Sequence, residues 1–275
     1  MQVPFSAITY LKNNFTTEVP FMSSVYNHCL YSHVDADNAI LHIWTTPKQV
    51  ALGPRDKQLP DSPAAIAWLA ANDYTMYNRN AGGLAVIGDS DILNASLIFQ
   101  QPDKPLSIDA AYQLVVTLLQ KALPTLTLTT GEVATSYCPG AYDISVNGQK
   151  IAGLAQHRYQ NKIAISFYLS IAGNQATRCA IIKQMYLIGL NSDIITPPYP
   201  NVNANSMTTL AALDTNYSME QVINNLTINW LPMLPFNRSL ISTTTLNHQI
   251  ERLQLRQSPL ITALNIRKAT KWSNI

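Results

Sequence analysis

The segment from Ser136 to Gly153 constrains the fold of this chain more than any other segment. Apolar and polar side chains alternate from Tyr142 to Val146, which is the pattern of a half-buried strand. Asn147-Gly148 comes next, and both residue types tolerate the positive φ angles of a two-residue type I′ turn. The sequence therefore predicts a β-hairpin whose second strand begins at Gln149.

The predicted hairpin carries an amine, and a thiol lies just before it. Pairing across the turn places Lys150 opposite Ser145, so a straight chain would put Cys138 about 23 Å farther along. The two groups can meet only if Pro139-Gly140 folds the preceding loop back over the strands. If they meet, Lys150 would lower the pKa of Cys138 and could transfer protons. The structural alternative is a buried thiol beside a solvated lysine at a strand edge.

Two segments resemble motifs of the biotin/lipoate-protein ligase family, which includes lipoate-protein ligases, biotin-protein ligases and octanoyltransferases. Residues 79–86, Arg-Asn-Ala-Gly-Gly-Leu-Ala-Val, resemble the Arg-x-x-Gly-Gly loop of this family. Residues 147–153, Asn-Gly-Gln-Lys-Ile-Ala-Gly, resemble the segment that carries its essential lysine. The resemblance covers roughly residues 38–190. It implies the catalytic fold of this family, an α/β (α+β) arrangement of mixed β-sheets flanked by helices.

Two further observations indicate the octanoyl- or lipoyl-amidotransferase branch, which moves an acyl group from the glycine cleavage H protein to other lipoyl domains. Residues 51–60 are similar to its Leu-Gly-x-x-Asp-x-x-Leu-Pro signature. Residues 136–143, Ser-Tyr-Cys-Pro-Gly-Ala-Tyr-Asp, resemble the segment just before the lysine hairpin where the branch keeps its acyl-accepting cysteine. His157 stands where an arginine is expected, and with Ala81 and Ala141 it leaves the acceptor preference open.

The resemblance implies an acyltransferase that works through a covalent intermediate and needs no cofactor. Cys138 would attack the amide of an octanoyl- or lipoyl-lysine on the glycine cleavage H protein and form an acyl-thioester. A lysine on a lipoyl domain of a 2-oxoacid dehydrogenase acyltransferase subunit would then accept the acyl group. Lys150 would activate the thiol and transfer protons. The choice between octanoyl and lipoyl cargo stays open.

The resemblance also indicates residues that would hold the acyl chain. The expected substrate-binding residues are Arg79, Gly82, Gly83, Leu84, Gly153 and Ala155. Gly82 and Gly83 lack a Cβ, so the backbone there could lie against an elongated chain. Backbone N–H groups between Gly153 and Ala155 could stabilise the tetrahedral oxyanion. A plain turn for the glycine pair and a surface cation for Arg79 are the structural alternatives.

Three other functions stay open at this point. An octanoyltransferase that takes its acyl group from acyl carrier protein would use the same thioester with a different donor. In an ATP-dependent lipoate-protein ligase, Cys138 would be incidental. A degenerate member of the family could bind lipoyl domains without catalysis. Incubation with each candidate donor would separate these functions from the amidotransferase.

Composition indicates a cytoplasmic enzyme without metal, membrane or nucleic-acid partners. The 275 residues are predicted to form a single domain, with a catalytic region at residues 36–230 and a mostly helical C-terminal segment at residues 231–275 packed on it. The net charge of +2 is too small to indicate nucleic-acid binding. The chain start lacks signal-peptide features, and no apolar stretch approaches the ~20 residues that span a bilayer. The three cysteines fit no zinc-binding spacing.

Hydrophobic periodicity predicts an α/β order around the hairpin. Strands are expected at residues 39–44, 84–87, 93–100, 125–129 and 162–171. Helices are expected at residues 63–72, 108–122 and 174–190, and Ser107 can cap the second of these. Ser218 and Gln221 form a capping box for a further helix. His42 is expected to be a hydrogen-bonded strand residue, and Cys179 a buried structural thiol.

Overall fold

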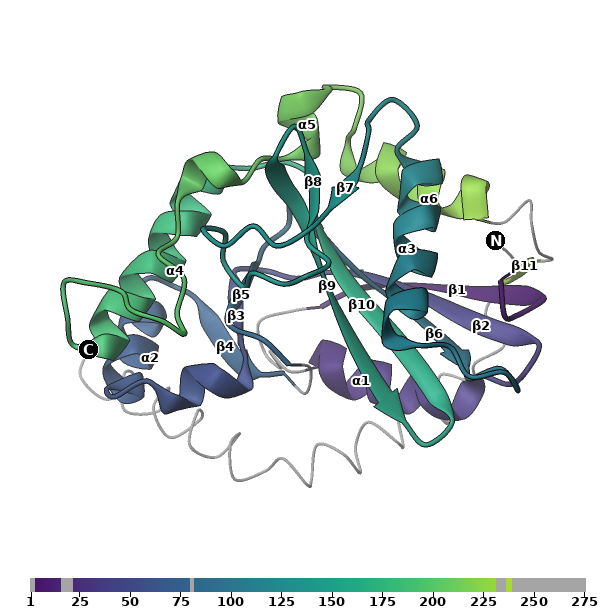
Figure 1. The fold of residues 1–275 in the computed structure, drawn as a ribbon, viewed down its shortest axis with the longest axis horizontal. Coiled ribbons are helices and arrows are strands. Elements are labelled where there is room, and N and C mark those ends of the chain that lie inside the picture. The colour runs from purple at the N-terminus through teal and green to yellow at the C-terminus, as the bar shows by residue number, and fades with distance from the viewer. Residues whose placement is uncertain (1–2, 16–21, 80–81, 231–235, 239–275) are drawn as a thin grey trace, which may run out of the picture.

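The computed structural model of this chain describes residues 3–15, 22–79, 82–230 and 236–238. These residues form two β-sheets, one of eight strands and one of three, with helices beside both (Figure 1). The arrangement confirms the predicted fold class of mixed sheets flanked by helices. Of the predicted helical segment 231–275, only residues 236–238 are described, and they form a strand. The rest of that prediction lies outside the described residues, and the division into regions stays a prediction.

The large sheet is mixed. Its strands, in spatial order, are β11 (Phe236–Arg238), β1 (Ala7–Asn14), β2 (Asn38–Thr45), β6 (Ile92–Gln100), β10 (Lys162–Ser170), β9 (Gln149–Tyr159), β8 (Ile144–Val146) and β7 (Thr129–Thr130). β1 pairs in parallel with β2 and β11, and the other pairs are antiparallel. The central strands β6 and β10 are buried along most of their length, which explains why apolar residues run almost continuously through them.

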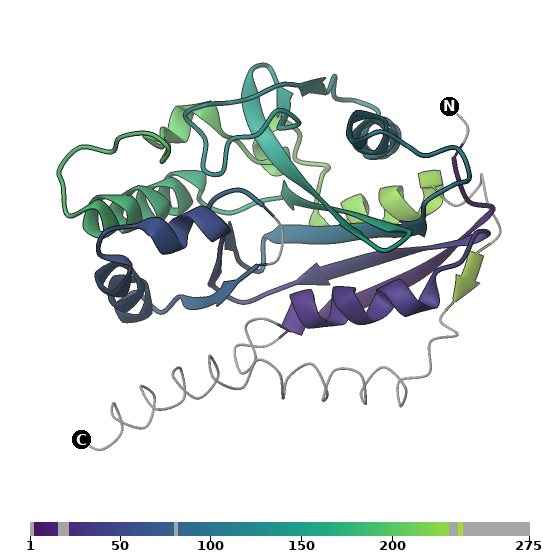
Figure 2. The same cartoon turned by 60° about the horizontal axis from the view of Figure 1, so that its bottom comes forward.

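Helices cover both faces of the large sheet. α3 (Ile108–Ala122) and α6 (Met219–Trp230) pack on one face, and α1 (Met22–Leu30) packs on the other (Figure 1, Figure 2). α3 begins where predicted, because the Ser107 hydroxyl accepts a hydrogen bond from the Ala110 N–H at 3.0 Å. The α1 face is the one that carries the site described below.

The small sheet belongs to a second apolar core. Its strands, in spatial order, are β4 (Thr75–Asn78), β3 (Gln49–Leu52) and β5 (Val86–Gly88). Buried residues of these strands form one cluster with residues of α2 (Ser62–Ala71) and α4 (Gln175–Leu190). The remaining described helices are the short α5 (Leu210–Leu213) and the 3-10 helices Tyr31–His33, Pro54–Gln58 and Ala204–Ser206. None of the helices in the described ranges has both the length and the apolarity that crossing a membrane requires.

The structure confirms most of the predicted elements. The strands predicted at residues 39–44, 93–100 and 162–171 are β2, β6 and β10, and the helices predicted at residues 63–72, 108–122 and 174–190 are α2, α3 and α4. The strand predicted at residues 84–87 is shifted along the chain and corresponds to β5. Ser218 caps α6 by accepting the Gln221 N–H at 3.2 Å, whereas the Gln221 side chain bonds to Asn225.

The strand predicted at residues 125–129 is wrong except at its last residue, where β7 begins. A side chain of α3 satisfies the backbone there. The Gln120 amide nitrogen donates to the Leu126 carbonyl at 2.7 Å, and the Gln120 amide oxygen accepts the Leu128 N–H at 3.0 Å. Because these groups are already paired, the segment does not need a strand partner despite its alternating sequence.

Candidate active site

The predicted hairpin is present, with Lys150 in the predicted register. Asn147 and Gly148 have φ angles of 51° and 77°, and a type I′ turn requires positive φ at both positions. β8 and β9 pair antiparallel, with Ser145 opposite Lys150. A register shift between Ile144 and Ser145 marks a bulge, which locally increases the twist of the hairpin.

Lys150 lies buried beneath the loop that precedes the hairpin. Its side chain is 0% exposed, and its Nζ lies 2.9 Å from Oδ1 of Asp143. Nζ also donates hydrogen bonds to the Ser136 hydroxyl at 3.0 Å, to the Tyr137 carbonyl at 3.0 Å and to the Cys138 carbonyl at 2.9 Å. All four of these oxygens come from the loop, so the amine holds the loop against the hairpin.

Asp143 closes the same loop. Its Oδ2 accepts the N–H groups of Val133 and Gly140, both at 3.2 Å. Burial raises the pKa of Asp143 and lowers the pKa of Lys150, while the attraction between the two charges opposes both shifts. The carboxylate faces N–H donors and the amine faces oxygens, so the two residues form a buried ion pair. Residues 133–143, which fold around this pair, are termed the cysteine loop below.

A second segment of the chain contacts the sulfur of Cys138. This residue has a φ of 48°, in the left-handed region that is uncommon for residues other than glycine. Its Sγ accepts hydrogen bonds from Arg79 Nη2 at 3.1 Å and from the Leu84 N–H at 3.3 Å. Arg79 Nη2 also donates to the Leu84 carbonyl at 2.7 Å. The structure thus joins Cys138 to Lys150 through the Cys138 carbonyl, and it brings Arg79 to the sulfur.

The two glycines of the Gly-Gly motif differ in their surroundings. A Cβ on Gly83 would lie 2.7 Å from Arg79 Nη2 and 2.9 Å from Cys138 Sγ, and the φ of 97° there is unfavourable for other residues. A Cβ on Gly82 would meet no described atom within 4 Å. Gly53 packs directly against the Gly83 carbonyl, which leaves no room for a Cβ on Gly53. The absence of a side chain at Gly83 therefore permits the contact between Arg79 and the sulfur.

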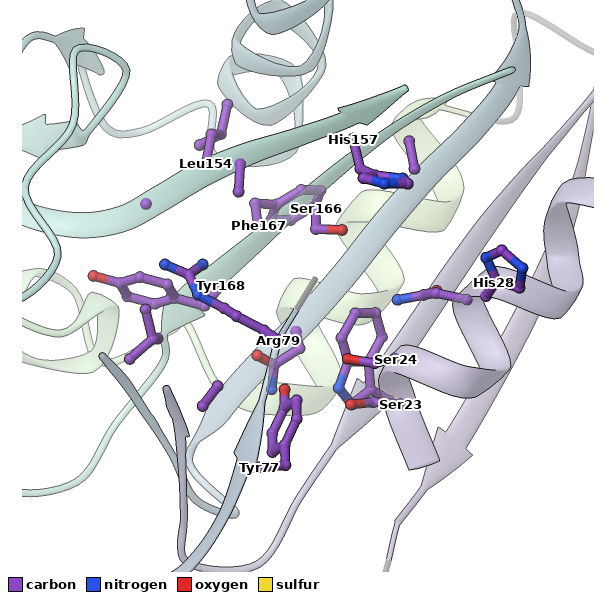
Figure 3. Close-up of a pocket in the computed structure, with 18 of the residues that line it drawn as sticks. Ser23, Ser24, His28, Tyr77, Arg79, Leu154, His157, Ser166, Phe167 and Tyr168 are labelled. Atoms are coloured by element: carbon purple, nitrogen blue, oxygen red, sulfur yellow. The ribbon is translucent and has the colours of Figure 1, made fainter. Parts of the chain in front are cut away.

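A groove beside Cys138 crosses the α1 face of the large sheet (Figure 3). Its volume is about 160 Å³. Its lining residues are Ser23, Ser24, Asn27, His28, Tyr31, Trp44, Ala51, Tyr77, Arg79, Val86, Asn94, Cys138, Gly153, Leu154, Ala155, His157, Ala164, Ser166, Phe167 and Tyr168. Figure 3 shows Arg79 and Tyr168 toward one end of the groove, and His28 and His157 toward the other. The groove therefore extends from the nucleophile candidate toward α1.

Small side chains of β9 and β10 form part of the groove lining. The register pairs Gly153 with Tyr168 and Ala155 with Ser166. A Cβ on Gly153 would lie 2.8 Å from the Tyr168 ring, so the glycine permits the ring to approach the strand. From Gly153 to His157 the strand spans about 13 Å, whereas an extended octanoyl chain is about 9 Å long. The groove is thus long enough for an octanoyl group.

Histidine and tyrosine side chains lie at the far end of the groove. The Tyr31 hydroxyl and His157 Nδ1 form a hydrogen bond of 2.8 Å. The His28 ring packs against the Tyr159 ring, with centroids 5.3 Å apart. Burial, with the neighbouring His157 as the smaller cause, lowers the pKa of His28. His157, which stands where an arginine is expected, thus belongs to an aromatic cluster at this end.

The structure divides the predicted substrate-binding residues into two groups. Arg79, Gly153 and Ala155 line the groove. Gly82, Gly83 and Leu84 do not appear among its lining residues, and the Leu84 side chain is buried in the core of the small sheet. Gly83 therefore lies beside the sulfur, where the chain turns to bring Leu84 into that core, and contact of Gly82, Gly83 and Leu84 with the acyl chain stays a prediction.

Asp56 is a residue of the site region to which the sequence alone assigned no role. Its Oδ2 accepts the Gly53 N–H at 2.6 Å, and its Oδ1 accepts the Tyr186 hydroxyl at 3.0 Å. The Tyr186 hydroxyl in turn accepts the Ala85 N–H at 3.2 Å. Burial raises the pKa of Asp56 to about 6. The Leu-Gly-x-x-Asp spacing in the sequence is the signal that points to Asp56. Through Tyr186, Asp56 connects this segment to Ala85, the residue after the Leu84 N–H that contacts the sulfur.

A second buried network supports the cysteine loop from α4. Arg178 is 3% exposed, and two of its nitrogens donate to the Asp89 carboxylate at 2.8 Å. Arg178 also donates to the Gln175 amide oxygen at 3.1 Å, and the Gln175 amide nitrogen donates to the Tyr137 hydroxyl at 3.3 Å. The residue before Cys138 is therefore fixed at its side chain as well as at its carbonyl.

The structural interpretations of His42 and Cys179 are confirmed. The two His42 ring nitrogens lie at hydrogen-bonding distances of 2.8 and 3.0 Å from the side-chain amides of Asn27 and Asn13, and burial lowers the pKa of His42 to about 3. Cys179 is 2% exposed, and burial raises its pKa to about 11. Neither residue lines the groove.

Comparison with known proteins gives a consistent set of relatives. A family model described as the lipoyl protein ligase A/B catalytic domain matches residues 20–229. The chain is similar to the octanoyl-[GcvH]:protein N-octanoyltransferase of Anoxybacillus flavithermus, with 35% identity over 69% of this chain and 68% of the relative. It is also similar to the lipoyl-[GcvH]:protein N-lipoyltransferase of Listeria monocytogenes, with 36% identity over 63% of each chain. A crystal structure of lipoate-protein ligase A bound with ATP shares the fold, with a TM-score of 0.69 at 17% identity and coverage of 90% of this chain and 94% of that chain.

Proposed function

This chain belongs to the lipoyl protein ligase A/B catalytic domain family, and on that premise we propose that it is an acyltransferase of the amidotransferase type. It moves an octanoyl group from a lysine of the glycine cleavage H protein to a lysine of a lipoyl domain, through a thioester on Cys138. The names of the similar octanoyl- and lipoyl-transferases support GcvH as the donor. The resemblance of residues 136–143 to the amidotransferase branch supports Cys138 as the nucleophile.

The position of Cys138 is the observation that carries this proposal. Its sulfur receives two hydrogen bonds and lines a groove of sufficient length for an octanoyl chain. Cys29 and Cys179 differ from it, because both are buried and burial raises the pKa of each to about 11. A thiol that is partly accessible and hydrogen-bonded to a cation is the type that acts as a nucleophile.

In the first half-reaction, the Cys138 sulfur attacks the carbonyl carbon of the donor amide. The carbon–sulfur bond forms, the carbon–nitrogen bond to the donor lysine breaks, and the thiol proton ends on the released amine. The products are an acyl-thioester on Cys138 and an unmodified donor lysine. Lys150 keeps the cysteine loop in place during this step, and its part in proton transfer stays a prediction.

In the second half-reaction, the amine of an acceptor lysine attacks the thioester carbonyl. The new amide forms, the acceptor amine loses a proton, and the Cys138 thiol is regenerated. Because one lysine amide replaces another, the overall exchange is nearly balanced in free energy. The reaction as a whole therefore needs no nucleotide.

Lipoyl transfer is the second candidate function, and the similarity to the Listeria monocytogenes lipoyltransferase favours it. The groove does not end at the length of an octanoyl chain, since the lining continues to His157 and α1. A lipoyl group, whose chain ends in a dithiolane ring, would place that ring at this far end. The two cargoes are therefore compared directly in the test.

The test is intact-mass measurement of the protein after incubation with octanoylated H protein without nucleotide. We expect one octanoyl group on the wild-type protein and on Cys179→Ala, none on Cys138→Ala, and loss of the label when a lipoyl domain is added. Parallel incubations use lipoylated H protein, octanoyl-acyl carrier protein, and free octanoate with ATP. Labelling of Cys138→Ala would overturn the proposal. So would labelling of the wild type by octanoyl-acyl carrier protein but not by octanoylated H protein.

A further inference from the structure

The groups around the Cys138 sulfur differ from those around its backbone. Lys150 Nζ has four oxygen neighbours, whereas an ammonium group has three N–H donors, so the cysteine loop fills the hydrogen-bonding capacity of Lys150. The sulfur instead accepts hydrogen bonds from Arg79 Nη2 and from the Leu84 N–H. Within the described residues, the cation that is hydrogen-bonded to the sulfur is thus Arg79.

Arg79 is held in this position by its surroundings. Its Nη2 donates to the Leu84 carbonyl at 2.7 Å, and the missing side chain of Gly83 makes room for the guanidinium. Figure 3 shows Arg79 within the groove, on the side of Tyr168. A guanidinium keeps its charge at every working pH, whereas burial lowers the pKa of Lys150. Arg79 therefore offers a permanent positive charge at the sulfur.

We propose that Arg79 is a catalytic residue that stabilises the Cys138 thiolate, with the Leu84 N–H as the second donor. This inference rests on the proposed function, because it takes Cys138 as the nucleophile. A positive charge and hydrogen bonds at the sulfur both favour its ionised form. Lys150 holds the cysteine loop through the Cys138 carbonyl, and its charge also attracts the thiolate.

The two roles produce different pH signatures in the alkylation of Cys138 by iodoacetamide. In Arg79→Gln, the rate at neutral pH should fall at least about tenfold, because the thiolate has lost its charge partner. At alkaline pH the rate should return to the wild-type value, because the thiolate then forms without help. In Lys150→Met, both the loop contacts and a charge near Cys138 are lost, so the rate should fall at neutral pH and return only partly at alkaline pH.

Two variants serve as controls for the arginine. Arg55→Gln makes the same substitution at an exposed arginine and should leave the pH profile unchanged. Arg79→Lys keeps the charge and should have a profile between those of the wild type and Arg79→Gln. If Arg79→Gln does not fold, Arg79→Ala with added methylguanidinium provides the second measurement, and restored alkylation at neutral pH is expected.

The outcome separates this inference from the proposed function, because alkylation needs no donor protein. An unchanged profile in Arg79→Gln, or no rescue by methylguanidinium, overturns the role of Arg79 even if octanoylated H protein labels the wild type. A shift that occurs only in Lys150→Met also overturns it. If the Arg79→Gln profile shifts as expected while no donor labels the wild type, the proposed function fails instead.

Discussion

Cys138 is held from two sides, and the two sides are built differently. On the backbone side, Lys150 and Asp143 form an ion pair whose side chains are 0% and 2% exposed. On the sulfur side, Arg79 and the Leu84 N–H reach Sγ from a turn whose glycines are exposed. The first side fixes the path of the cysteine loop, and the second contacts the reacting atom.

The difference shows where stability and reactivity reside in this site. A buried ion pair contributes little net stability, since desolvation offsets the attraction, but it is costly to break. Here it holds a cysteine at a φ of 48°, and such strained positions persist only where the surrounding structure over-determines them. The sulfur side has to leave room for an acyl carbonyl. Substitutions on the backbone side should therefore affect folding most, and substitutions on the sulfur side should affect thiol chemistry most.

The largest expected effect is that of Asp143→Ala. It leaves the buried Lys150 ammonium without its counter-ion and two backbone N–H groups of the cysteine loop without an acceptor. We expect the free energy of unfolding, measured by urea denaturation, to fall by about 3–5 kcal/mol. Asp193→Ala, which makes the same change at an exposed position, should stay within about 0.5 kcal/mol of the wild type.

A double variant distinguishes an unpaired charge from simple loss of packing. In Lys150→Met/Asp143→Leu no buried charge remains, so the loss should be smaller than the sum of the two single losses. The double variant should still fail to form the acyl-thioester, because the loop has lost its hydrogen bonds. Additive losses of stability would show that the two charges do not act as a pair.

The next effect concerns Asp56, which contacts the sulfur side through Gly53 and Tyr186. Burial raises the folded-state pKa of Asp56 to about 6 from the usual 3.8. The folded protein therefore binds the proton more tightly than the unfolded chain, and protonation of Asp56 at low pH stabilises the fold. That stabilisation is complete below the unfolded-state pKa and is lost as the pH rises through about 6. Because the amide introduced by Asp56→Asn stays neutral, the wild type should lose up to about 3 kcal/mol relative to this variant over that range.

The measurement is urea denaturation of both proteins at pH values on either side of this range. Changed hydrogen bonds to Gly53 and Tyr186 would add an offset that does not depend on pH. Asp193→Asn serves as the control and should run parallel to the wild type. Parallel curves for Asp56→Asn and the wild type would mean that the carboxyl titrates alike in the folded and unfolded chain.

Local signals explain which elements of the fold could be predicted. The Asn147-Gly148 turn, the Ser107 cap and the apolar runs of β6 and β10 each act over a few residues, and the structure contains all of them. β1, β3, β4 and α1 could not be predicted in this way. α1 turns polar residues such as Ser23 and Asn27 toward the groove, and its first turn contains no acidic residue that would signal a helix start.

The site was predictable in its chemistry but less so in its contacts. Motif spacing indicates a thiol and an amine, whereas the atom of Cys138 that Lys150 contacts depends on the path of the cysteine loop. Arg79 and Cys138 are 59 residues apart in sequence, so only the tertiary structure brings them together. The glycine motif predicts a contact with the acyl chain, which stays a prediction, and the position of Gly83 against Arg79 and the sulfur appears only in the structure.

The smallest expected effect compares the two glycines of that motif. In Gly83→Ala, the new methyl group would lie 2.7 Å from Arg79 Nη2 and 2.9 Å from Cys138 Sγ, at a φ of 97°. Arg79 Nη2 ends a flexible side chain and Sγ can move by rotation about one bond, so we expect a stability loss of only about 1–3 kcal/mol from the backbone strain. The displaced sulfur should nevertheless react more slowly with iodoacetamide at neutral pH and accept less octanoyl group from the donor.

Gly82→Ala is the control, because it adds a methyl group with no described atom within 4 Å and should keep the wild-type rates. Equal rates for the two variants would mean that the turn does not hold Arg79 at the sulfur, and the contrast between the two sides of Cys138 would lose its basis.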